Sequence, residues 1–119
     1  MCGFKGDRGL AIEFVVTGSP RDVASAIEEY AHAQGRVSAI VVPWESNATM
    51  LSMAVTSVKS DGWAIEHTNL GTITLTDLGN ASTAVAVTAH DPDHPEKPKL
   101  ATLFDRFAQQ LEGRFGAPR

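Results

Sequence analysis

His67 is the side chain of this sequence best suited to acid-base chemistry. It follows Trp63 and Ile65 at a spacing of two residues, which places all three on one face of a strand. If that face packs on the core, the imidazole could act as an acid, a base or a group that orients a ligand. A histidine at the rim of the sheet, or one bonded to a backbone carbonyl, is the alternative that we prefer. No catalytic residue is therefore assigned, and His67 stays as the candidate for a cyclase-like or isomerase-like enzyme.

A second group of reactive side chains lies between His90 and Glu96, where two imidazoles and three carboxylates occur within seven residues. Such groups are ligands for zinc and for harder divalent cations. The two prolines of this segment spread the groups out, and no helical or turn spacing brings them together. We therefore predict a solvated acidic loop, with no metal and no cofactor.

The chain opens with Met1-Cys2-Gly3, which would expose a cysteine nucleophile at the N-terminus once the methionine is removed. Glutamine amidotransferases begin in this way, but nothing downstream resembles their fold and this chain is too short for it. We expect residues 1–8 to be flexible instead. Because Cys2 is the single cysteine, an internal disulfide is excluded.

Large apolar side chains, together with His67, could line a pocket for a small apolar molecule. Tyr30 and Trp44 would add polar atoms to such a pocket. The core of an α+β domain needs the same kinds of side chain, and a core is the default interpretation. The aromatic and sulfur-containing members of this set are Phe14, Tyr30, Trp44, Met53, Trp63, Phe104 and Phe107.

Composition limits the remaining classes of function. The length of 119 residues fits one domain covering residues 1–119, which has enough chain to bury a core. The net charge of −4 is small and the ten Lys and Arg residues are scattered, so nucleic acid is not an expected partner. No apolar run approaches a membrane span or a signal region, so we expect a cytoplasmic protein without a membrane partner.

The first structural elements are a strand and a helix. Apolar residues alternate with other residues from Leu10 to Thr17, which predicts a half-buried strand that ends at Gly18. Ser19 can cap the helix that follows, because its hydroxyl can accept a hydrogen bond from a free backbone N–H of the first turn. Pro20 suits the first helical position, which is a second signal for the start of the helix. Helical spacing of apolar residues continues until Gly35, which predicts the end of the helix there.

Strands dominate the next part of the chain. The alternating or apolar runs cover residues 37–42, 50–58, 63–68, 72–76 and 83–89. Ser60-Asp61-Gly62 predicts a hairpin turn between two of them. Asn69-Leu70-Gly71 either turns the chain or bends one long strand, and the sequence leaves this open. Glu13 and Glu66 are expected on the solvated face of the sheet.

An amphipathic helix is predicted at the end of the chain. Apolar residues recur at helical spacing from Leu100 to Phe115, within a helix from Lys99 to Arg114. Such a stripe needs a large apolar partner, and one face of the sheet is suited to that role. The sequence thus predicts an α+β fold: an antiparallel sheet of five to six strands with both helices on one face.

This order of elements resembles a short form of the START/polyketide-cyclase (SRPBCC, helix-grip) domain. The matching runs are Val16–Val23, Gly71–Gly79, the strand that ends at His90, and the C-terminal helix. The resemblance implies a cavity between the sheet and the last helix, filled by a small apolar ligand. The simpler layout of TATA-binding-protein-like domains fits nearly as well and implies no DNA binding here. A module for protein interaction, such as a homodimer formed through a sheet edge or exposed face, is the alternative function.

Overall fold

The computed structural model describes residues 7–61, 63–90 and 97–116. Five strands and two long helices are present, with one 3₁₀ turn, η1. Their order is β1 (Asp7–Thr17), α1 (Pro20–Gln34), β2 (Val37–Val41), η1 (Pro43–Glu45), β3 (Met50–Asp61), β4 (Ala64–Gly79), β5 (Ser82–His90) and α2 (Lys97–Phe115). Residues 7 and 8, at the end of the segment that we expect to be flexible, lie in β1.

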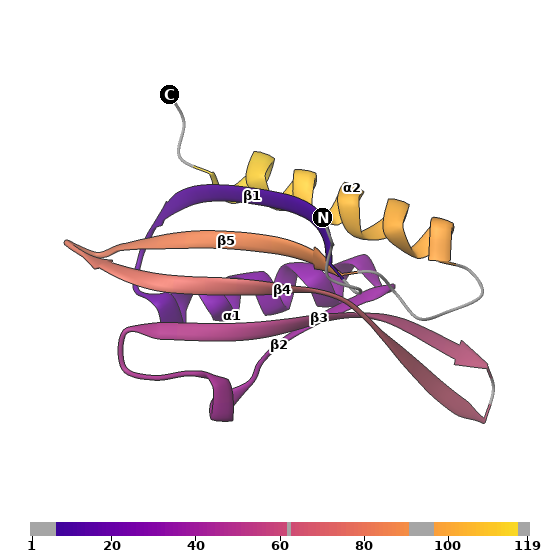
Figure 1. Ribbon diagram of the computed structural model, residues 1–119. Helices are drawn as coiled ribbons and strands as arrows, with labels where there is room; N and C mark the ends of the chain where they lie inside the picture. The colour runs from indigo at the N-terminus through magenta and orange to yellow at the C-terminus, as the bar shows by residue number, and fades with distance from the viewer. Residues whose placement is uncertain (1–6, 62, 91–96, 117–119) are drawn as a thin grey trace.

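The strands form a single antiparallel sheet in the order β1-β5-β4-β3-β2. Both helices lie on the same face, with α1 packed mainly on β2 and its neighbours, and α2 packed on β1, β4 and β5. Figure 1 shows the two helices behind the sheet, whose other face carries no helix. The predicted α+β class, with its long C-terminal helix, is confirmed.

Helix α1 begins and ends where its local signals predict. The Ser19 hydroxyl accepts a hydrogen bond of 3.2 Å from the backbone N–H of Asp22, and Pro20 occupies the first helical position. Gly35 follows the last turn with a φ of +80°, a conformation that costs glycine little because it has no Cβ.

The core lies between the helix-bearing face of the sheet and the two helices. Strands and helices both contribute fully buried side chains, among them Ile27, Met53, Leu70, Ile73, Leu75, Phe104 and Leu111. Tyr30 of α1 also packs on α2, with ring centroids 6.0 Å from Phe107 and 5.8 Å from Phe115. The helices therefore contact each other as well as the sheet, and together they cover that face.

Strand β4 contains a bulge that settles the open question about residues 63–76. Val55 of β3 pairs with Gly71, but the next residue, Thr56, pairs with Asn69, so Leu70 has no partner across the ladder. The chain thus continues as one long strand. Because faces alternate with every residue, one extra residue exchanges the two faces beyond it.

The bulge overturns one expectation. Ile73 and Leu75 point into the core, whereas Ile65 and His67 lie on the opposite face, beyond the bulge. Trp63 and Ile65 were predicted on the buried face, but Trp63 is fully exposed and Ile65 is 65% exposed. In this region β3 and β4 form a two-stranded ribbon that projects past the rest of the sheet (Figure 1).

Candidate functional site

The side chains that were expected to line one pocket are distributed over three regions. Phe14, Met53, Phe104 and Phe107 are buried in the core. Tyr30 is half-buried between the helices, where its hydroxyl donates to Gln110 Oε1 at 3.4 Å.

The other members of the predicted set are exposed. Trp44 lies in η1 with 84% of its side chain exposed, and Trp63 lies in the turn between β3 and β4. His67 lies on the projecting ribbon, where its Nδ1 is 3.3 Å from Thr56 Oγ1. The set therefore does not converge on one cavity.

His90 also lies on the face of the sheet that the helices leave uncovered. Its Nε2 is 3.1 Å from Thr72 Oγ1, on the neighbouring strand. Each of the two described histidines of the sheet thus contacts a threonine hydroxyl across a strand pair. Neither imidazole enters the core, which is the environment that the acid-base hypothesis for His67 required.

Two sequence candidates lie outside the described residues. These are Cys2 and the segment 91–96 of the acidic loop. Within residues 7–61, 63–90 and 97–116, no group of three or more His, Cys, Asp or Glu side chains gathers in a way that could hold a metal ion. No helix in this part of the chain has the length and apolar character needed to cross a membrane.

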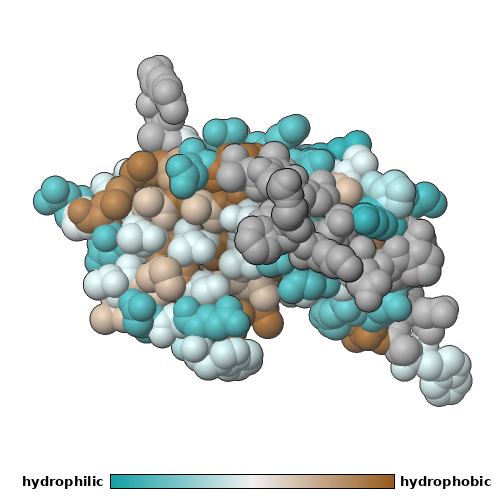
Figure 2. All heavy atoms as spheres, in the orientation of Figure 1, coloured by the Kyte–Doolittle hydropathy of each residue, from teal (hydrophilic) through white to brown (hydrophobic). Residues whose placement is uncertain are grey.

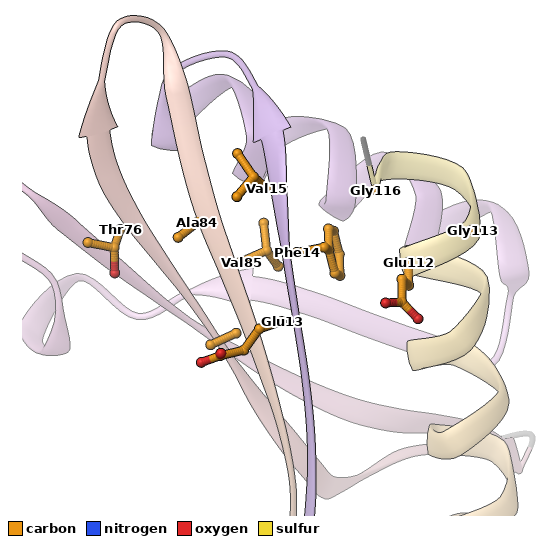
Figure 3. A pocket seen from close by; sticks show the side chains of 10 residues that line it. Glu13, Phe14, Val15, Thr76, Ala84, Val85, Glu112, Gly113 and Gly116 are labelled. Atoms are coloured by element: carbon orange, nitrogen blue, oxygen red, sulfur yellow. The ribbon is translucent and has the colours of Figure 1, made fainter. Parts of the chain in front are cut away.

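A depression of about 830 Å³ lies where the last turn of α2 approaches the edge strand β1. It is open to solvent and extends from α2 around β1 onto the neighbouring strands. Figure 3 shows Phe14 and Glu112 between β1 and α2, with Glu13, Ala84 and Thr76 beyond β1. The lining residues are Glu13, Phe14, Val15, Thr76, Ala84, Val85, Ala86, Glu112, Gly113 and Gly116.

The chemistry of this depression is apolar with an acidic border. Val15 is its exposed large apolar side chain, and Phe14 and Val85 border it from the core. The ionisable groups of the lining residues are the carboxylates of Glu13 and Glu112. An apolar surface beside two carboxylates suits a molecule with a hydrophobic body and a basic or hydrogen-bond-donating group.

Of the predicted pocket residues, Phe14 alone lines this depression. The sequence signal that was missed is the pair of glycines at the end of α2, Gly113 and Gly116. A methyl group at Gly113 would have no atom within 4 Å, so the helix has space on that side. Glu13 was expected to be solvated, and it is indeed exposed, but it also borders the depression.

A smaller depression of about 220 Å³ lies between the end of α1, the start of β2 and the middle of α2. Arg36, Arg106 and Gln110 are among its lining residues. Its volume is below the roughly 300 to 1,000 Å³ typical of ligand sites, whereas the depression beside β1 falls within that range. The depression beside β1 is therefore the candidate site.

Comparisons with known proteins leave the family of the chain open. No family model and no curated protein matches it. A solved structure described as a START superfamily protein from Mycobacterium smegmatis is 17% identical, with 89% of this chain and 95% of that chain covered. The TM-score is 0.42, which is too low to assign this chain to that superfamily.

Proposed function

We propose that this chain binds a small, mainly apolar molecule in the depression beside β1 and the last turn of α2. The observation that supports the proposal is a volume of about 830 Å³ bordered by Phe14, Val15 and Val85. This volume accommodates a molecule of the size of a metabolite or a short lipid. The ligand would lie at the edge of the sheet, since the space under the middle of α2 is filled by side chains of the core.

The acidic border narrows the class of ligand. A carboxylate that approached Glu13 or Glu112 would be repelled, whereas an ammonium or guanidinium group would be attracted. Both glutamates are exposed, so water and salt weaken this selection and we expect it to be modest. The proposed ligand therefore has an apolar body and a basic group.

A matched pair of probes tests this proposal. 1-Naphthylmethylamine and 1-naphthylacetate share an aromatic body and carry opposite charges at neutral pH. Titrations followed by the fluorescence of the naphthyl ring should give tighter binding of the amine, by about threefold to tenfold at low salt. Replacing both glutamates with glutamine should remove this preference and leave the affinity for the ring.

Gly113→Trp provides the test of location. A large side chain there would enter the open space beside α2 and should weaken the binding of both probes by about tenfold or more. Ser25→Trp, on the exposed side of α1, is the matched control and should have no effect. If neither probe binds, or if Gly113→Trp binds both as well as the control does, the proposed function is wrong.

A further inference from the structure

The uncovered face of the sheet, called here the open face, has a composition unlike that of an ordinary solvated surface. It consists of the outward residues of all five strands, as the pairing registers define them. The described side chains on it are Glu13, Val15, Thr17, Ser38, Ile40, Met50, Ser52, Ala54, Thr56, Thr72, Thr74, Thr76, Ser82, Ala84, Ala86, Thr88 and His90. Among these side chains Glu13 is the single carboxylate. Glu45 of η1 adds a second carboxylate beside this face, where its Oε1 accepts a hydrogen bond of 3.5 Å from Ser52 Oγ.

The outer surfaces of the helices differ from the open face. Arg21, Glu29 and Arg106 are among the charged side chains exposed on α1 and α2. Depletion of charge is the feature that separates the centre of a protein interface from the rest of a surface. By this measure the open face resembles an interface, and the helical side does not.

The exposed large apolar side chains are also absent from the outer surfaces of the helices. In the described part of the chain, no exposed large apolar side chain lies on α1 or α2. Val15 and Ile40 lie on the open face with 43% and 57% of their side chains exposed, and Ile65 continues it along the ribbon. Trp44, Trp63 and Leu78 lie at the ends of the strands or in the turns. Figure 2, which views the open face, shows much of it in white, tan and brown.

We propose that a second copy of this chain covers the open face, so that the two sheets pack face to face in a symmetric dimer. Glu13, Val15, Thr76, Ala84 and Ala86 of this face also line the depression beside β1, so a ligand bound there would compete with the dimer. Two identical faces meet without conflict only if each carries little charge, because like charges repel when they are buried together. The whole chain has a net charge of −4, yet the described side chains of the open face include one carboxylate, Glu13 at the β1 border, with Glu45 of η1 beside Ser52. The low charge therefore fits self-association.

The small size of the central side chains also fits this partner. Thr74 and Ala86 lie side by side on β4 and β5, whereas Ser52, next to Thr74 on β3, is already buried beside Glu45 of η1. Short side chains leave a level surface, on which a second sheet can lie at the spacing of about 10 Å seen between packed sheets. The larger Val15 and Ile40 lie on the two edge strands, β1 and β2, and would border the contact.

The available area is near the requirement for a dimer. With strands about 4.8 Å apart and a rise of about 3.3 Å per residue, each outward residue occupies about 32 Å², so the seventeen described outward residues form a face of about 540 Å². Two such faces would bury about 1,100 Å², just below the area of most specific interfaces. We therefore expect a dimer that dissociates on dilution.

The test is the mass of the full chain in solution, measured by sedimentation equilibrium from about 1 to about 200 μM. The wild-type mass should rise from 12.7 kDa towards twice that value. Thr74→Arg places a charge at the centre of the open face and should keep the chain monomeric. Ser25→Arg adds the same charge to the exposed side of α1 and should dimerise like the wild type.

Circular dichroism and thermal unfolding establish that each variant is folded. If Thr74→Arg fails to fold, Ile40→Lys takes its place, because Ile40 is already 57% exposed at the β2 edge. A wild-type mass of one chain at every concentration overturns the proposal and leaves the open face to another partner. A Thr74→Arg or Ile40→Lys variant that is folded and dimerises normally also overturns it, since the contact must then lie elsewhere.

Discussion

The ring of Phe104 in α2 lies directly against the backbone of Gly71 in β4. A methyl group at Gly71 would be 2.5 Å from Phe104 Cζ, and the backbone oxygen of Thr88 would be closer still. Gly71 pairs with Val55 at the bulge of β4, so the approach of α2 depends on the absence of a side chain at this place in the sheet.

Gly71→Ala should therefore destabilise the protein by about 2 kcal/mol, the cost of overpacking a filled core. The free energy of unfolding from urea titrations measures this change. Gly113→Ala is the matched control, because a methyl group there meets no atom within 4 Å. Alanine favours a helix over glycine, so the control should be stabilised by up to about 1 kcal/mol. Equal unfolding free energies for the two variants would show that Phe104 does not pack as described.

A second prediction concerns the two sides of the bulge. Leu70→Ala removes a fully buried side chain and should cost about 2 to 5 kcal/mol of unfolding free energy. Ile65→Ala, on the exposed ribbon, should change it by no more than about 0.5 kcal/mol in the dilute protein. Without the bulge, Ile65 would share the buried face with Ile73 and Leu70 would lie on the open face. In that register Ile65→Ala would cost more than Leu70→Ala. Urea titrations of both variants at low protein concentration distinguish these registers.

The bulge also marks the limit of what the sequence predicts about the fold. The bounds of α1 follow from Ser19, Pro20 and Gly35, because caps act within a few residues of the chain. The exchange of faces at Leu70 depends on which residue of β3 pairs with Gly71, and alternation within β4 contains no information about that pairing. This single residue moves Ile65 to the open face, whereas Trp63 is exposed because it lies in the turn at the end of the ribbon.

The candidate site was predicted less well than the fold. Aromatic type shows that a side chain favours burial, but it does not show which side chains border the same space. Phe104 and Phe107 are buried in the core, whereas Trp44 lies in a 3₁₀ turn outside it. The depression depends on the approach of α2 to β1, a long-range relation that residue spacing does not contain.

A third prediction concerns the turn between β4 and β5. Asn80 and Ala81 have φ angles of +54° and +56°, the left-handed conformation of a two-residue hairpin turn. Asparagine tolerates this conformation but alanine does not favour it, so Ala81→Gly should stabilise the protein by about 0.5 to 1 kcal/mol. Thermal unfolding measures the gain. Ala101→Gly, within α2, is the same change in an ordinary helical position and should cost about 0.5 to 1 kcal/mol. A loss of stability in Ala81→Gly would contradict the left-handed turn.

The last prediction concerns Thr83, a polar side chain that is completely buried. Its hydroxyl donates a hydrogen bond of 2.8 Å to the backbone oxygen of Gly18 and so ties the link between β1 and α1 to β5. Valine has nearly the same shape but no donor, so Thr83→Val leaves a carbonyl without this partner and should cost about 1 to 3 kcal/mol. Thr102→Val is the control: its hydroxyl also donates to a backbone oxygen, that of Pro98 at 3.1 Å, but at an exposed site where water can replace it. The control should lose no more than about 0.5 kcal/mol. Hydrogen exchange of the amides at the start of α1 should accelerate in Thr83→Val alone; equal exchange in both variants would mean that this bond does not hold the link in place.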